Sequence, residues 1–296
     1  MKTQQGFSLI ELAIVLVIVT LLIGGLAMPL SAQIQARRVS ETRADMQAIH
    51  DALIGYAMSH YVLPPSCTCN YDVSAVFIPA TSCTPTLLCP LSGAANSSFT
   101  PVRHHLPCPD APNDGNASTT NDNDGMEETR NSTSGNCPLI RGALPWATLG
   151  LKGHDAWGNR YTYAVTSQFA NNRTGFTSLQ TASDPPVSPP TPPSSGSMNV
   201  FASSACGTAL IPGVPMIVIS HGPNGRGAQN VNGGTPLTAS SVPINERVNL
   251  AGFTPVAPCT INSFVTQTPT EPFDDLVVWI SSNELFNRVC QSGGCP

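Results

Sequence analysis

The feature that most constrains this chain is an almost wholly apolar run from Phe7 to Met28. At about 1.5 Å per residue, a helix of this length spans roughly 33 Å, which is enough to cross the hydrocarbon core of a bilayer. The only formal charge in the run is Glu11, and a carboxylate inside a membrane is costly and usually functional. The sequence therefore predicts a transmembrane helix over residues 7–28, preceded by a short polar leader at residues 1–6.

Two other interpretations of the same run stay open. A secretory signal peptide cut near Ala32 is disfavoured, because such peptides have no use for a carboxylate at the start of the apolar core. The residues Leu30-Ser31-Ala32 also make a poor small-x-small cleavage site. An uncleaved membrane anchor is the second alternative.

The residues around the start of the run, Gly6-Phe7-Ser8-Leu9-Ile10-Glu11-Leu12, resemble the prepilin signal of type IV pilins and type II secretion pseudopilins. The resemblance implies that a prepilin peptidase/methyltransferase cleaves after Gly6 and methylates the new amino terminus at Phe7. It implies that the helix forms the filament core, with other pilin or pseudopilin subunits and an inner-membrane assembly platform as partners. The chain is then expected in the bacterial inner membrane, single-pass with its head in the periplasm, and later in a filament.

Glu11 has an expected role in assembly. Within one chain in lipid we expect its carboxylate to be unpaired, which is costly. In a bundle of staggered helices, the free amine of Phe7 on an incoming chain could pair with Glu11 of its neighbour. Such pairing would remove the penalty of a buried lone charge and set the register between subunits.

The helix is expected to continue beyond the membrane as an amphipathic segment over residues 29–62. Apolar residues recur there at three- and four-residue steps, with charged residues at other positions. The helix should end at Leu63-Pro64-Pro65, because proline lacks the amide donor and disfavours helix before it. The glycines and the proline between Gly24 and Pro29 predict a kink or local melting.

The remainder, residues 63–296, is predicted to form one exported globular head. The expected fold class is α+β and pilin-like, with the long helix packed on an antiparallel sheet. Met216–Ser220 and Leu276–Ser281 are predicted as buried strands, and Ser282–Val289 as a short helical segment. The Pro/Ser-rich segment 184–197 is interpreted as a surface loop of this head, and a linker between two lobes is the alternative.

A second resemblance lies in the middle of the head. Asp155-Ala156-Trp157-Gly158, followed by an alternating strand up to Val165, is similar to the turn and strand in the heads of major pseudopilins. Gly158 should allow a tight turn, and Asp155 should accept backbone donors. Trp157 is expected to cap the core.

All ten cysteines lie in the head, which indicates an oxidising compartment and a head held by disulfides. The disulfide candidates are Cys67, Cys69, Cys83, Cys89, Cys108, Cys137, Cys206, Cys259, Cys290 and Cys295. Sequence proximity makes Cys83–Cys89 and Cys290–Cys295 possible, whereas a Cys108–Cys137 pair would close an acidic loop. Other pairings stay open.

Zinc is the competing interpretation of some of these cysteines. His104, His105 and Cys108 are close in sequence, and Cys67-x-Cys69 precedes them. The chain has no Cys-x-x-Cys pair, and the inferred compartment is oxidising. We therefore expect no zinc site.

The acidic loop offers a candidate calcium site formed by Asp110, Asp122, Asp124 and Glu127. The segment Asn121-Asp122-Asn123-Asp124-Gly125 has the oxygen-rich, Gly-turned character of calcium loops, although its spacing does not fit an EF-hand. The alternative is a solvated acidic loop with Asx turns and no ion. No cofactor is expected beyond this structural calcium.

The sequence favours a non-enzymatic role. It contains no nucleophile elbow, phosphate-binding loop, zinc-protease helix or dinucleotide-binding glycine pattern. The net charge of −5 gives no electrostatic reason to expect nucleic acid as a partner. The predicted function is a structural subunit, a minor pilin or pseudopilin, of a type IV pilus or type II secretion filament.

Two alternative functions remain. One is a binding module at a pilus tip that contacts a surface, a host glycan or DNA. The other is a periplasmic protein that the helix anchors without filament assembly, for which Glu11 should be dispensable.

Overall fold

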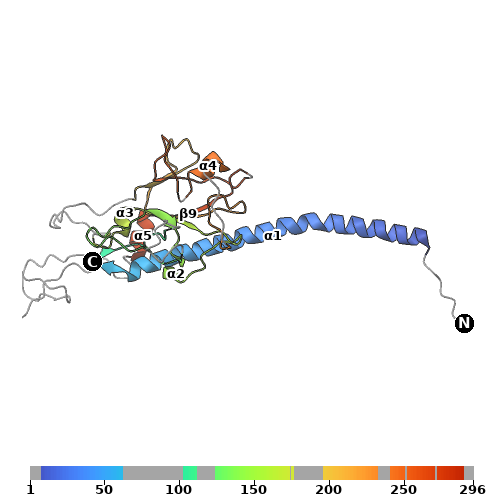
Figure 1. Ribbon diagram of the computed structural model, residues 1–296, viewed down its shortest axis with the longest axis horizontal. Coiled ribbons are helices and arrows are strands. Elements are labelled where there is room, and N and C mark those ends of the chain that lie inside the picture. Colours follow the sequence, from blue (N-terminus) through green and yellow to red (C-terminus); the bar gives the residue numbers. More distant parts are fainter. Residues whose placement is uncertain are drawn as a thin grey trace, which may run out of the picture.

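The protein consists of one long helix that projects far beyond a head of short helices and strands (Figure 1). The structure, a computed structural model, describes eight stretches, with backbone alone at 21–30, 61–62 and 103. These stretches are residues 8–62, 103–111, 124–173, 175–176, 196–232, 241–250, 252–270 and 272–289.

The long helix α1 (Leu9–Ser59) is continuous through residues 24–29, where the sequence predicted a kink or local melting. It is gently curved in Figure 1. Its last four turns bury one apolar face against the head, with Met46, Ile49, Leu53, Ile54 and Ala57 all at most 4% exposed. The helix ends before the predicted Leu63-Pro64-Pro65 stop, because His60 adopts an extended conformation (φ −107°, ψ 105°).

The core of the head is a four-stranded antiparallel sheet in the order β3-β4-β7-β9. The strands are β3 (Arg141–Ala143), β4 (Thr162–Val165), β7 (Met216–Ser220) and β9 (Leu276–Ile280). All residues of β7 are buried, because this central strand is covered on both faces. Both predicted strands are confirmed, and they pair with each other from Met216↔Ile280 to Ser220↔Leu276. Burial is complete only for β7, because β9 is an edge strand whose three middle residues are partly exposed.

Helices of the head flank this sheet and α1. The predicted segment at the C-terminal end is confirmed as α5 (Ser282–Val289), which contacts α1 and buries Leu285 and Val289. The one-turn helix α2 (Trp146–Leu149) also contacts α1. A further turn, α3 (Ser167–Ala170), follows β4, and a short antiparallel pair joins β1 (Tyr61–Val62) to β2 (Arg103–His104).

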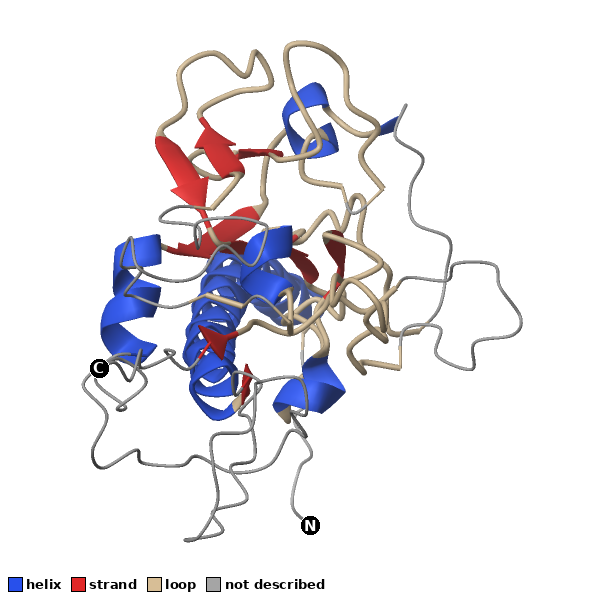
Figure 2. Ribbon diagram, turned by 90° about the vertical axis from the view of Figure 1, so that its left-hand side faces the viewer, coloured by secondary structure: helices blue, strands red, loops and turns tan. Residues whose placement is uncertain are grey.

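A second sheet, in the order β6-β5-β8, lies on the side of the head away from α1, together with α4 (Ile244–Arg247) (Figures 1 and 2). Its strands are β5 (Met198–Phe201), β6 (Ile211–Val214) and β8 (Ser263–Val265). We call residues 198–214 and 241–265, which carry these elements, the outer lobe. The outer lobe has a hydrophobic cluster of its own, which includes Phe201, Leu250 and Phe253.

The antiparallel prediction is wrong for one strand pair in the outer lobe. β5 and β8 are parallel, with Val200 opposite Phe264. A parallel pair needs a long crossover between its strands, and the chain between β5 and β8 supplies it. The class α+β is confirmed, whereas the segment 184–195 of the Pro-rich loop lies outside the described residues.

The turn at Asp155 largely follows the prediction. Asp155 Oδ1 accepts from the amides of Trp157 and Asn159, both at 2.9 Å, and Gly158 has a φ of 83°. Trp157, however, does not cap the core. It is half-buried beside α1, where its indole nitrogen donates to Gln35 Oε1 at 3.3 Å, because this polar group requires an acceptor.

Two disulfides lie within the described part of the chain. One is Cys108–Cys137, which the sequence offered as one of several possible pairs and which closes the acidic loop, and the other is Cys206–Cys259 within the outer lobe. Because the sulfur of Cys108 is engaged in a disulfide, it is no zinc ligand. Cys67, Cys69, Cys83, Cys89, Cys290 and Cys295 lie outside the described residues, as do the two predicted neighbour pairs they include.

Candidate functional site

The first candidate site is the start of α1. Ser8 is the N-cap residue, and its hydroxyl accepts from the Glu11 amide at 3.3 Å. The Glu11 carboxylate in turn accepts from the Ser8 amide at 2.9 Å and from the Ser8 hydroxyl at 3.1 Å. This reciprocal arrangement is a capping box, which satisfies amides that no helical carbonyl can reach.

The capping box corrects the expectation that Glu11 has no partner within one chain. Serine at the N-cap and glutamate three residues later is a pattern that the sequence contains, and it is the signal that could have predicted this contact. Gly6 and Phe7, the predicted processing site, lie outside the described residues. The capping box begins directly after them.

The first turns of α1 expose apolar side chains. Leu9 is 90% exposed, Ile10 is 69% exposed, and Val19 is still 42% exposed. The intervening large apolar residues are also exposed, and this part of α1 lies beyond the head (Figure 1). A continuous apolar surface of this kind marks contact with other protein chains or with lipid.

Among the residues whose side chains the structure describes, no helix has both the length and the apolar character required to cross a membrane. The predicted transmembrane run 7–28 includes Phe7 and residues 21–28, which fall outside that set. The membrane span therefore stays a prediction.

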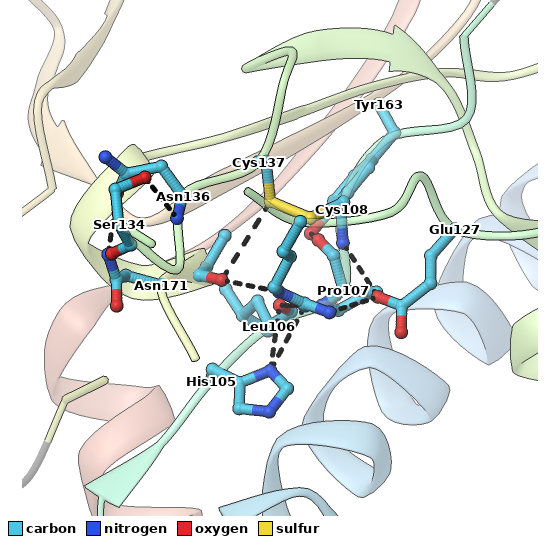
Figure 3. The surroundings of a disulfide bond; sticks show 12 residues. His105, Leu106, Pro107, Cys108, Glu127, Ser134, Asn136, Cys137, Tyr163 and Asn171 are labelled. Carbon is cyan, nitrogen blue, oxygen red and sulfur yellow. Dashed lines mark hydrogen bonds and ion pairs between the residues drawn. A yellow bond between two sulfur atoms is a disulfide. The ribbon is translucent and has the colours of Figure 1, made fainter. Parts of the chain in front are cut away.

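The second candidate region surrounds the Cys108–Cys137 disulfide (Figure 3). Glu127 accepts from the Tyr56 hydroxyl at 2.8 Å and from the Cys108 amide at 3.1 Å, and it pairs with Arg130 at 3.1 Å. Arg130 also donates to the carbonyl of Leu106 at 2.9 Å. These contacts attach the acidic loop to α1 and give Glu127 a structural role.

The two other predicted calcium ligands that the structure describes, Asp110 and Asp124, do not converge on Glu127. Asp110 is buried, and its Oδ2 accepts from the Gly125 amide at 2.9 Å, whereas Asp124 is exposed and accepts from the Met126 amide at 2.8 Å. Burial raises the pKa of Asp110 to about 7. Within the described residues these three carboxylates do not form a group close enough to share an ion. Asp122 lies outside the described residues, so calcium at this loop stays a prediction.

His105 lies beside this network, and its burial makes the folding stability depend on pH. Burial, together with the charge of Arg130 at 3.2 Å from its Nδ1, lowers the pKa of His105 to about 4 from an ordinary value of 6.5. Between these two values the unfolded chain binds a proton that the folded chain does not, so folding stability falls as the pH falls from 6.5 to about 4. We expect His105 to account for a loss of about 2–3 kcal/mol between about pH 7 and about pH 4.5.

Denaturant unfolding at the two pH values checks this prediction, with His105→Gln as the matched variant. Glutamine keeps an acceptor for Arg130 but does not titrate. Between about pH 7 and about pH 4.5, the unmodified protein should therefore lose about 2–3 kcal/mol more of its free energy of unfolding than the variant does. An equal loss in both proteins would contradict the assigned role of His105.

A third group of side chains lies where the outer lobe meets the main sheet. Glu246 of α4 is 0% exposed, Asp275 is 1% exposed and Asp274 is half-buried, and their ligand atoms lie within 4.8 Å of one another. Burial raises the pKa of Asp274 to about 7, and the negative charges of Glu246 and Asp275 add to the shift. These residues were not among those predicted from the sequence. The signal that could have found them is an acidic pair placed directly before a buried strand.

Beside this group lies an arrangement similar to a catalytic triad. His221 Nε2 is 2.8 Å from Thr162 Oγ1, and His221 Nδ1 is 3.4 Å from Asp275 Oδ1. His221 is 0% exposed, Thr162 is 4% exposed and Asp275 is 1% exposed. Because all three side chains are buried, we assign the arrangement to the packing of β4 against the turn after β7. Ser220, the neighbour of His221, donates instead to Asp155 at 2.8 Å.

Comparison with protein families gives a match at the N-terminus. Residues 1–27 match the family model of the prokaryotic N-terminal methylation motif. Comparison with curated proteins and with solved structures gives no match. The motif therefore covers the leader and the first turns of α1, and the head is interpreted from its own residues.

Proposed function

We propose that this chain, whose first 27 residues carry the signature of type IV pilins and pseudopilins, is a non-enzymatic structural subunit of a type IV pilus or type II secretion filament. The observation that carries the proposal is that the motif leads directly into α1, whose first turns extend beyond the head with apolar side chains exposed (Figure 1). Such a surface requires lipid or neighbouring helices around it.

We propose that the apolar surface of α1 has two roles, first in the membrane and then in the filament. Before assembly the apolar helix holds the chain in the inner membrane, with the head in the periplasm. A prepilin peptidase/methyltransferase then processes the N-terminus, and an assembly platform transfers the helix into a bundle with other subunits. The two disulfides of the head support an oxidising compartment such as the periplasm.

A minor subunit fits the shape of the head better than a major one. The outer lobe adds a second sheet and a second hydrophobic cluster on the side away from α1 (Figure 2). When helices such as α1 pack closely in a bundle, the heads must fit around it, and an added lobe requires room that a repeating array restricts. We therefore propose a place at the tip or at intervals along a filament.

The mass of the mature N-terminal peptide from native membranes tests the processing step. We expect a peptide that begins at Phe7 and carries one additional methyl group. A start near Gln33 would identify an ordinary secretory signal, and a retained Met1 would identify an uncleaved anchor. Either result would overturn the proposal.

A Gly6→Leu variant is the control for this measurement, because a bulky residue before the cut should leave the leader attached. The same membrane preparations also distinguish a filament subunit from a protein that is anchored in the membrane without joining a filament. A filament subunit is found in sheared filaments or in a cross-linked complex with other subunits, whereas an anchored protein stays with the membrane alone.

A further inference from the structure

The buried carboxylates of Glu246, Asp274 and Asp275 have a hydrogen-bond arrangement that goes beyond the proposed function. Each carboxylate uses one oxygen within the protein. Glu246 Oε1 accepts from Asn224 Nδ2 at 2.8 Å and from the Asp274 amide at 3.1 Å. Asp274 Oδ2 accepts from the Asn224 amide at 2.9 Å, and Asp275 Oδ2 accepts from Asn249 Nδ2 at 2.8 Å.

The second oxygen of each carboxylate is buried and has no hydrogen-bond partner. These atoms are Glu246 Oε2, Asp274 Oδ1 and Asp275 Oδ1. Leaving one such acceptor unsatisfied normally destabilises the folded state, and more strongly when the group is charged. Three such oxygens on neighbouring residues at the junction of two sheets require an explanation, and a bound ion is one that accounts for all three.

The nearby positive charges do not compensate this group. Arg226 Nη1 is 3.9 Å from Glu246 Oε2, beyond hydrogen-bond distance, and its side chain is 35% exposed. The fully buried His221 approaches only Asp275, at 3.4 Å, and its Nδ1 has no hydrogen-bond partner. Neither side chain lies within hydrogen-bond distance of Glu246 Oε2 or Asp274 Oδ1, so these buried oxygens stay without a donor.

The donor set indicates which ligand fits. All three free atoms are carboxylate oxygens, which hard divalent cations prefer, whereas soft metals prefer sulfur and nitrogen. Two oxygens that each bind one calcium ion at about 2.4 Å lie at most about 4.8 Å apart. The ligand atoms of the three residues all lie within 4.8 Å of one another, so each pair of residues is close enough to share one calcium ion.

We propose that Glu246, Asp274 and Asp275 form a calcium site that joins the outer lobe to the main sheet. Glu246 belongs to α4 of the outer lobe, whereas Asp274 and Asp275 lead into β9 (Figure 1). The ion links these two parts, and water completes its coordination. This site is distinct from the acidic loop in which the sequence predicts calcium.

The test uses the full chain in detergent, stripped with a chelator and then given calcium chloride. Because the ion binds only the folded site, calcium should raise the melting temperature by at least about 3 °C at saturation. One equivalent of calcium should stay with the protein through gel filtration. Magnesium chloride at the same concentration should have a smaller effect, because magnesium is smaller and gives up its water reluctantly.

Glu246→Gln and Asp275→Asn are the site variants, since each keeps its shape and one acceptor oxygen. Both should lose the calcium-dependent shift, and without calcium Glu246→Gln should melt at or above the unmodified protein because repulsion is relieved. The matched control is the double variant Asp122→Asn/Asp124→Asn in the acidic loop, which should keep the shift.

Two results would overturn the site. One is an unmodified chain that retains no calcium and does not shift. The other is a shift that survives in both site variants or disappears in the acidic-loop control. The retained equivalent is measured on the unmodified protein, so the proposal stays testable if a variant fails to fold. Neither result affects the N-terminal processing on which the proposed function depends.

Discussion

Replacing Arg141 with leucine is expected to lower the free energy of unfolding of the head by about 3–5 kcal/mol. Arg141 lies in β3 and is 6% exposed, yet its guanidinium reaches across to the outer lobe. Nη1 donates to the carbonyls of Val248 and Leu250 at 2.9 and 3.0 Å, and Nη2 donates to that of Ser263 at 2.9 Å. Leucine would leave these three acceptors without a donor.

The aromatic surroundings of Arg141 add to this expected effect. The guanidinium carbon lies 3.9 Å from the centroid of the Phe264 ring and 5.7 Å from that of Phe253. Burial lowers the pKa of Arg141 to about 9, so the charge depends on these rings and carbonyls for its stabilisation. Arg141→Lys should also be destabilising, because one ammonium group cannot span the same carbonyls.

Denaturant unfolding of the full chain in detergent measures this loss. The control is Arg288→Leu on the exposed side of α5, which should change stability by no more than about 0.5 kcal/mol. If Arg141→Leu also stays within about 1 kcal/mol of the unmodified protein, Arg141 does not hold the outer lobe to the main sheet.

The parts of the fold that the sequence predicted are those with a local pattern. The apolar runs at β7 and β9 predict buried strands because each run is short and bounded by turn residues. The segment that forms α5 was predicted at its observed bounds, and the turn at Asp155 has the expected glycine and acceptor. In each case neighbouring residues specify the element, so no knowledge of distant contacts is needed.

The outer lobe was not predicted because long-range contacts define it. β5 pairs in parallel with β8 across more than sixty residues of chain, and no local pattern encodes that pairing. The burial of Arg141 is equally invisible in sequence, since arginine is usually exposed. The carboxylates of Glu246 and Asp275 come together only through the same packing of the outer lobe on the main sheet.

The two disulfides show the same difference between features that a local sequence pattern predicts and features that long-range contacts define. Cys108 and Cys137 flank one acidic loop, so their pairing could be named from the sequence. Cys206 and Cys259 are 53 residues apart and meet because β5 and β8 are neighbours. Once a strand pairing is known, such a disulfide follows from it, but the cysteine spacing alone does not identify it.

Glu11 has two separable roles, one within its own helix and one proposed between subunits. Within α1 the carboxylate accepts from Ser8, which stabilises the first turn whatever surrounds the helix. Between subunits its charge is proposed to pair with the free amine of Phe7 in a neighbouring chain. The local role needs an acceptor atom at position 11, whereas the intersubunit role needs a negative charge there.

Glu11→Gln and Ser8→Ala separate these roles. Glutamine keeps the acceptor of the capping box and removes the charge, so incorporation into filaments should fall by at least about tenfold, or about 1.4 kcal/mol, with leader cleavage intact. Ser8→Ala keeps the charge and removes the cap, so incorporation should fall much less. Immunoblots of sheared filaments, normalised to the processed chain in membranes, give both values. Normal incorporation of Glu11→Gln together with loss in Ser8→Ala would place the function of Glu11 in the helix cap, and the proposed charge pair between subunits would be wrong.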